Sequence, residues 1–361
     1  MTTPNSQPSP HRAGRLASLM LTGACSAALF SASEALATEH EGSSHLELVL
    51  RLQPELIHAS GDRPDARSTD GWAISDGWAG SNTNSAGWGA LVLRGHHEVH
   101  PGLKMIAELG LNIDAEGLKD GASATREAFV GLKGDWGQVI GGRLESPYRL
   151  AGLGWDPLNA TFMQARGNLG RTGGLFGHAG NFNSAVEYAS PAGPVQFRGF
   201  VAFDSAVTPG DSSNDHTWSF SVSAPVGPVD LIFSHIEGSE YRGGPDNVTG
   251  SKLSARYANG PFAVSGSYER RDSGLEDGDF LFGTVSYRWQ DWTLAANAGH
   301  FNDDGGASND GMYFAFGGRY HLSDQVSVHT GLQYNDRDIG GDELVLGVGL
   351  RILLATGNLI R

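Results

Sequence analysis

The sequence feature that most limits the possible folds is an alternation of apolar and polar side chains with a period of two residues. In the stretch 103–112, Leu103, Met105 and Leu109 share one face of an extended chain. Lys104 and Glu108 take the other face, because successive side chains of a strand point to opposite sides. Most of the chain beyond residue 43 repeats this pattern. The alternation predicts an all-β protein whose strands have one apolar and one polar face.

The connectors between these strands are of two kinds, tight and long, which alternate along the chain. Tight connectors lie at 97–103, 134–138, 190–195, 224–229, 258–262, 289–292 and 322–326. Long polar connectors lie at 57–86, 114–122, 148–182, 204–214, 238–250, 271–278, 302–311 and 335–342. Short turns at one end and long loops at the other are typical of bacterial outer-membrane barrels. The seven tight turns and two terminal strands predict about sixteen strands.

The alternation alone leaves two arrangements open. In a secreted β-sandwich the apolar faces would form the core, whereas in a membrane barrel they would face lipid and the polar faces would line a lumen. Six aromatic residues near the tight turns match the interfacial girdles of membrane barrels: Trp136, Tyr257, Phe262, Trp289, Trp292 and Tyr320. No apolar stretch after Phe30 approaches the roughly 20 residues of a membrane helix. We therefore expect a transmembrane antiparallel β-barrel, closed because lipid cannot satisfy a free sheet edge.

Residues 1–37 are predicted to be a secretory signal peptide. A weakly basic start precedes an apolar run, and Ala-Leu-Ala at 35–37 matches the cleavage pattern Ala-x-Ala. A lesser alternative is lipid attachment at Cys25, although leucine stands three residues before the cysteine in the usual lipoprotein box and Leu21 stands four before it. The mature barrel is expected to comprise residues 38–361.

The charge of the chain limits its partners. Loss of the two arginines and one glutamate of residues 1–37 changes the net charge from −15 to −16. An acidic protein of this kind is not expected to bind nucleic acid.

Several longer motifs carry a family resemblance. They are "LRGHHEVHPGLK" (93–104), "REAFVGLKGDWGQVIGGRLESPYR" (126–149), "GWDPLNATFMQAR" (154–166) and "NSAVEYASPAGPVQFRGFVAF" (183–203). Their order of hairpin, long loop and Ser-Val-Tyr-type strand resembles the general porins of Gram-negative bacteria. The resemblance implies a trimeric outer-membrane barrel of sixteen strands that passes small hydrophilic solutes and ions by passive diffusion, surrounded by lipid and lipopolysaccharide.

The same resemblance implies a constriction. In the family the third loop folds into the lumen and faces arginines of the wall, and by position that loop is 148–181 here. The implied constriction residues are Arg51, Arg94, Arg143 and Arg198 of the wall together with Asp156, Arg166 and Arg171 of the loop. Because Asp156 is the only carboxylate of this loop, the preference for anions or cations stays open: the acidic chain favours cations at the mouths, and a basic constriction favours anions. The chain also continues to Arg361 where family members typically end on phenylalanine.

Other chemistries are less well supported by the sequence. His96, His97 and His100 cluster at a turn, but neighbouring strand residues diverge, so no metal site and no cofactor are expected. An enzyme barrel would need a nucleophile and a base within hydrogen-bonding reach, and no Gly-x-Ser-x-Gly motif occurs. A substrate-specific channel for sugars or anions remains the main alternative. Only Phe200, Phe282 and Tyr313 supply aromatic groups to the predicted inner face.

Overall fold

The computed structural model describes residues 43–61, 71–75, 89–113, 125–165, 181–203, 216–238, 247–272, 277–304, 310–338, 341–357 and 359. The chain divides into two units, Met1–Gly42 and Ser43–Arg361, and every described residue belongs to the second. The predicted signal peptide and Cys25 therefore lie outside the described residues.

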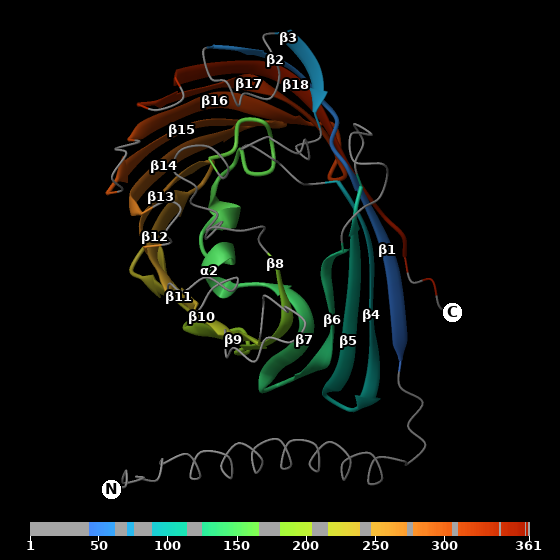
Figure 1. Cartoon of the computed structure of the whole chain (residues 1–361). Helices are drawn as coiled ribbons and strands as arrows, with labels where there is room; N and C mark the ends of the chain where they lie inside the picture. The colour runs from blue at the N-terminus through green and yellow to red at the C-terminus, as the bar shows by residue number, and fades with distance from the viewer. Residues whose placement is uncertain are drawn as a thin grey trace, which may run out of the picture. The chain divides into compact units, whose positions relative to one another are not determined.

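The described residues form eighteen β-strands in one sheet. In chain order they are β1 (Ser44–Leu52), β2 (Glu55–Ser60), β3 (Gly71–Ser75), β4 (Ala90–His100), β5 (Leu103–Asn112), β6 (Thr125–Gly134), β7 (Gly137–Glu145), β8 (Asn181–Ala189), β9 (Gln196–Phe203), β10 (His216–Val226), β11 (Val229–Gly238), β12 (Val248–Asn259), β13 (Phe262–Asp272), β14 (Gly278–Trp289), β15 (Trp292–Asp303), β16 (Gly311–His321), β17 (Val326–Arg337) and β18 (Gly341–Ala355). From β4 to β18 each strand pairs antiparallel with the next, and β1 pairs with both β4 and β18. The sheet therefore closes into a barrel (Figure 1).

Two of the eighteen strands share their place in the wall with a neighbour. β1 and β2 pair with β18 in one unbroken register, from Val49 opposite Ala355 to Ser60 opposite Leu344. Pro54 interrupts this strand, because proline has no backbone N–H to donate to the ladder. On the other side, β2 pairs with β3 and β1 pairs with β4. Counting β1 with β2 and β3 with β4 gives sixteen wall strands, which confirms the predicted number.

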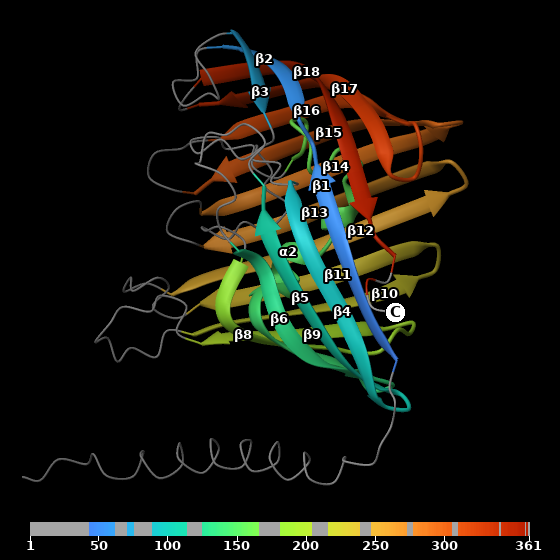
Figure 2. The same cartoon turned by 90° about the vertical axis from the view of Figure 1, so that its right-hand side faces the viewer.

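The tight turns lie where the sequence predicts them. Only two residues separate β6 from β7, β10 from β11, β12 from β13 and β14 from β15. These turns gather at one end of the barrel (Figure 2). The asymmetry between tight turns and long connectors is therefore a property of the fold.

Side chains are distributed inside out relative to a soluble protein. Large apolar residues on the outward face are open to the surroundings: Leu253 is 50% exposed, Leu281 53% and Phe316 57%. Polar residues of the inward face are buried, among them Lys252 and Glu269. This distribution suits hydrocarbon outside and polar surroundings inside, and it confirms the transmembrane β-barrel. In the described part of the chain, no helix has the length and apolar character to cross a bilayer.

One segment between β7 and β8 leaves the wall and packs inside the barrel. Residues 146–165 contain the short helix α2 (Pro147–Leu150) and the 3₁₀ turn η1 (Leu153–Trp155). α2 contacts β9, β10, β11 and β12, and it lies within the ring of strands in Figure 1. We call residues 146–165 the inner segment.

Candidate functional site

The inner segment begins with a capped turn. The Ser146 side chain accepts a hydrogen bond from the Arg149 N–H, and Pro147 occupies the first turn, where a missing N–H does no harm. Arg149 also pairs with Glu145 at 3.0 Å. These local bonds start the helix within one residue of the end of β7, so the chain turns inward at once.

Tyr148 fixes α2 to the barrel wall. Its hydroxyl donates to Glu269 of β13, which also accepts from Arg271 Nε. Lys252 lies 5.0 Å from the Tyr148 ring centroid, in the range of a cation–π contact. The position opposite is Gly250, where a Cβ atom would lie 2.7 Å from the Tyr148 oxygen. Burial and the Glu269 charge raise the pKa of Tyr148 well above its usual value, so the hydroxyl remains a donor.

Asp156 organises the next turn of the inner segment. Its carboxylate accepts hydrogen bonds from the Leu158 N–H at 2.8 Å, the Ala165 N–H at 3.3 Å and Asn297 Nδ2 at 2.7 Å. The residue is only 7% exposed, and burial raises the pKa of its carboxyl despite these bonds. Asp156 therefore joins the segment to β15, and its carboxylate is turned away from open solvent.

The end of the inner segment is bound to the seam where the first and last strands meet. Glu55 accepts from the Phe162 N–H at 3.1 Å and lies 2.7 Å from His329 Nε2. Arg351 Nη2 donates to the carbonyl oxygen of Ala160 at 2.6 Å, and Gln53 donates to the same oxygen. The interruption of the strand at Pro54 thus lies beside groups that hold the segment.

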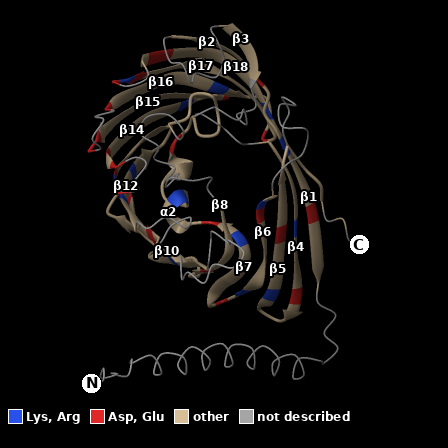
Figure 3. Cartoon of the chain, in the orientation of Figure 1, with Lys and Arg blue, Asp and Glu red and all other residues tan. Residues whose placement is uncertain are grey.

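Predicted arginines of the inward face lie on β1, β4 and β9, the last of which also contacts α2. Arg94 of β4 pairs with Glu47 of β1 at 2.7 Å, and its side chain is 49% exposed. Arg198 of β9 pairs with Glu187 of β8 at 3.3 Å, and its side chain is 42% exposed. Arg51, which shares the inward face with Glu47, is half-buried. Basic and acidic positions are interleaved along these strands (Figure 3).

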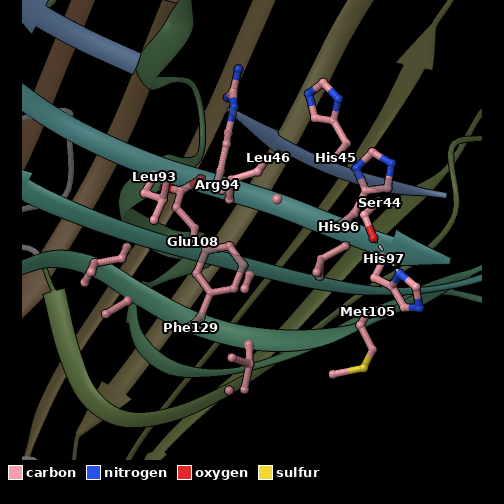
Figure 4. A pocket seen from close by; sticks show the side chains of 17 residues that line it. Ser44, His45, Leu46, Leu93, Arg94, His96, His97, Met105, Glu108 and Phe129 are labelled. Atoms are coloured by element: carbon pink, nitrogen blue, oxygen red, sulfur yellow. Dashed lines mark hydrogen bonds between the residues drawn. The ribbon is translucent and has the colours of Figure 1, made fainter. Parts of the chain in front are cut away.

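Arg94 lies beside a concavity of about 680 Å³ in the wall of β1 and β4–β7. In Figure 4, Arg94 projects to one side of the strands and Met105 to the other. Glu108 is the cross-strand neighbour of Arg94 on β5, so the arginine stands between two carboxylates, Glu47 and Glu108.

The remaining predicted residues lie elsewhere. Arg143 alternates with Leu144, which is 2% exposed, and shares its face with Val139, which is 40% exposed. Its guanidinium donates to the carbonyl oxygen of Thr125 at 2.8 Å and to Asn183 at 2.6 Å. Arg143 is thus not brought together with Arg51 and Arg94. Arg166 and Arg171 lie outside the described residues.

Sequence reasoning missed the groups that hold the inner segment. These are Gln53, Glu55, Tyr148, Lys252, Glu269, Arg271, Asn297, His329 and Arg351. The available signal was alternation: a charged residue on an inward face either faces water or meets a buried partner, and Lys252, Glu269 and Arg271 are all at most 1% exposed. Among the residues that the structure describes, no three His, Cys, Asp or Glu side chains gather as a metal site would require.

Comparison with known proteins agrees with this geometry. The chain matches the Gram-negative porin family over residues 22–340. No curated protein sequence matches it.

Among solved structures, an anion-selective porin from Comamonas acidovorans has a TM-score of 0.67 at 18% identity, covering 86% of this chain and 100% of that one. A loop-deletion mutant of OmpT, an outer membrane protein of Vibrio cholerae, has a TM-score of 0.64 at 15% identity, covering 87% and 100%. OmpF of Salmonella typhi, in complex with daunomycin, has a TM-score of 0.64 at 12% identity, covering 87% and 98%. By the family match and the closed sixteen-stranded barrel, the chain belongs to the Gram-negative porin family and is an outer-membrane diffusion channel.

Proposed function

We propose that the channel passes small hydrophilic solutes and ions passively, through a constriction between the inner segment and the wall of β1 and β4–β8. The observation that carries this proposal is the one-sided attachment of the inner segment. Its side-chain contacts run to Glu269, Asn297 and Glu55, whereas Arg94 on β4 keeps a side chain that is 49% exposed. In this proposal the predicted loop 148–181 narrows the lumen, and Asp156 supports it from behind.

The wall charges are proposed to act on hydrated solutes through a transverse field. Arg94 is flanked by Glu47 and Glu108, and Arg198 is paired with Glu187. The opposite charges of these groups offset one another, and 0.1 M salt screens their remaining field beyond about 10 Å. The ion selectivity is therefore expected to be weak. The related channel from Comamonas acidovorans is described as anion-selective. Here the pairing of the arginines favours a weaker preference.

A channel is also favoured over an enzyme. Two serine–histidine contacts occur in the described residues: Ser251 with His235, and Ser44 with His97, each at 2.8 Å. Ser251 and His235 are cross-strand partners, so their backbone N–H groups belong to a ladder and are poorly placed to stabilise an oxyanion. Neither pair shows a carboxylate that orients the histidine within the described chain. We therefore expect purified protein to release no fatty acid or p-nitrophenol from ester substrates.

The outward face supports self-association in the membrane. Outward residues make up most of the lining of the 680 Å³ concavity, with Leu46, Leu93 and Met105 around the small residues Gly95 and Ala107. Arg94 and Glu108 of the inward face also line it. We propose that this face packs in a homotrimer, with lipid and lipopolysaccharide around it. The molar mass of the protein–detergent complex, from light scattering with chromatography, tests this; a monomer would contradict it.

Planar-bilayer recording of purified protein tests the channel itself. We expect stable conductance steps and a small reversal potential in a salt gradient. The double substitution Arg51→Gln with Arg94→Gln should move the reversal potential towards cation selectivity, because Glu47 and Glu108 lose their compensating charges. Arg143→Gln is the matched control and should leave the potential unchanged. Absence of conductance would refute the channel, and equal effects of the two substitutions would refute the role of the wall arginines.

A further inference from the structure

A second recess lies beneath the inner segment, towards the tight-turn end of the barrel. It has a volume of about 300 Å³ and is lined by Trp155 of the inner segment and by wall residues of β9, β10 and β11. The polar wall residues are Gln196, Ser223 and Asp230. A volume of this size is at the lower end of the range for small-molecule sites.

Trp155 is held in place by its backbone. Its N–H donates to the Gly152 carbonyl oxygen at 3.0 Å, and its own carbonyl oxygen accepts from Ser265 Oγ at 3.2 Å. Gly152 has a φ of +74°, and a Cβ there would lie 2.8 Å from Ser254 Oγ, so the segment rests directly on β12. The indole of Trp155 is half-buried. These bonds hold the backbone that carries the indole, which limits the rearrangement needed to receive a ligand.

The polar residues facing Trp155 form a continuous patch of the wall. Ser223 pairs across the strands with Gln196 on one side and with Ile232 on the other. Asp230 lies two pairs further towards the turn, opposite Pro225; it is exposed and has Arg256 as its cross-strand neighbour on β12. All of these share the inward face by alternation. The recess therefore has an aromatic side and a hydrogen-bonding side.

From this arrangement we infer that the recess is a binding subsite for a neutral polyhydroxylated solute, a mono- or disaccharide, on its way through the lumen. The apolar C–H face of a sugar ring matches the indole of Trp155. Sugar hydroxyls both donate and accept, as do the Gln196 amide and the Ser223 hydroxyl, and Asp230 adds an acceptor. Arg256 beside Asp230 offsets the negative charge, which favours a neutral solute over a cation.

The inference rests on the proposed function, because a solute reaches the recess through the lumen. A channel subsite must bind weakly enough to release its ligand. Its expected signature is a saturable reduction of ion current when maltose is added, beyond the linear reduction that viscosity causes. Occupancy of the subsite, rather than bulk solution, then limits the current.

The experiment is a maltose titration of the conductance in planar bilayers. Trp155→Ala should raise the half-saturation concentration roughly tenfold, the loss expected from removing an aromatic contact of about 1.4 kcal/mol. Trp155→Phe should lie closer to the wild type, and Asp230→Asn, which keeps the shape, should raise it by a smaller factor. Trp136→Ala, at a tight turn and 44% exposed, is the control and should change nothing.

The outcomes separate the two proposals. A protein that does not conduct refutes the channel function. A conducting protein whose current falls only linearly with maltose, in the wild type and in Trp155→Ala alike, refutes the subsite and leaves the channel intact. Saturable block by choline but not by maltose, lost in Asp230→Asn, refutes the assignment to neutral sugars.

Discussion

The sulfur atom of Met163 occupies the space that a side chain at Gly317 would need: a Cβ atom there would lie 2.5 Å from it. Gly331, on the neighbouring strand, faces the same sulfur atom, and a Cβ at Gly347 would lie 3.0 Å from the Phe162 ring. Glycines at consecutive inward positions of β16, β17 and β18 thus form a recess in the wall. The end of the inner segment fits into it.

Filling this recess should displace the inner segment. Gly317→Ala is expected to destabilise the docked segment by about 1–3 kcal/mol, the usual effect of overpacking. The single-channel conductance should rise and the open-channel noise should increase. Gly283→Ala is the control, since nothing lies within 4 Å of a Cβ at that position.

A double-substitution cycle identifies the cause. A Cβ at Gly317 would also lie 2.7 Å from the Thr330 carbonyl oxygen, so the substitution also strains the wall itself. Met163→Ala removes the sulfur, and a coupling energy above about 0.5 kcal/mol between the two substitutions would mark direct contact. Strict additivity would show that the recess does not seat Met163.

Burial of Asp156 should make the docking of the inner segment depend on pH. Burial raises the pKa of its carboxyl above the ordinary 3.8. A raised pKa in the folded state means that the stabilisation is fully present below pH 3.8 and is lost as the pH rises through the raised value. Open-channel noise should therefore fall as the pH is lowered from neutral towards 4. Asp156→Asn should abolish this dependence, and an unchanged pH profile in that variant would contradict the assignment.

The sequence predicted the wall of the barrel well, because a period of two and a tight turn are local signals. The segment 126–145 illustrates this: its alternation and its Gly134–Gly137 turn correspond to β6 and β7. Arg143 shows the limit of assigning a residue to the inward or outward face by alternation alone. Its side chain lies on the face opposite to Ile140 and Leu144, which are 7% and 2% exposed. Val139 and Ile140 are both apolar, so the alternation of β7 does not say locally which parity faces the lumen.

The site was harder to predict because its contacts join residues that are far apart in the chain. Tyr148 and Glu269 are separated by 121 residues, and Phe162 and Glu55 by 107. Nothing in the alternation says which inward charge the inner segment will cover. Asp156 was accordingly expected at the constriction, whereas it is buried against β15. Inward glycines on neighbouring strands were a usable signal for the recess in β16–β18 that receives the end of the inner segment.

Arg351 should anchor the end of the inner segment. Its Nη2 donates to the carbonyl oxygens of Ala160 at 2.6 Å and Asn159 at 3.3 Å. Hydrogen bonds from a charged donor contribute roughly 1.5–3 kcal/mol each, so Arg351→Met should free this end of the segment. Limited proteolysis of the purified protein should then cut within residues 156–165 faster than in the wild type. Arg351→Lys keeps the charge and should give an intermediate rate, and equal rates in all three proteins would exclude an anchoring role.

The pair Arg198–Glu187 should matter more for stability than the pair Arg94–Glu47. Glu187 has a side chain that is 3% exposed, whereas that of Glu47 is 19% exposed. Removing the arginine leaves each carboxylate without its partner, and an unpaired buried charge destabilises a protein by on the order of 1–3 kcal/mol or more. Water can solvate Glu47 far better than Glu187, so Arg198→Gln should lower the thermal unfolding midpoint in detergent, and Arg94→Gln should change it little. Because Arg198 is itself 42% exposed, solvent screens part of the interaction, and the loss should lie at the lower end of that range.

The double substitution Glu187→Gln with Arg198→Gln removes the unpaired charge and should recover most of the midpoint. If it unfolds as early as Arg198→Gln alone, the arginine stabilises the wall through packing rather than through its charge.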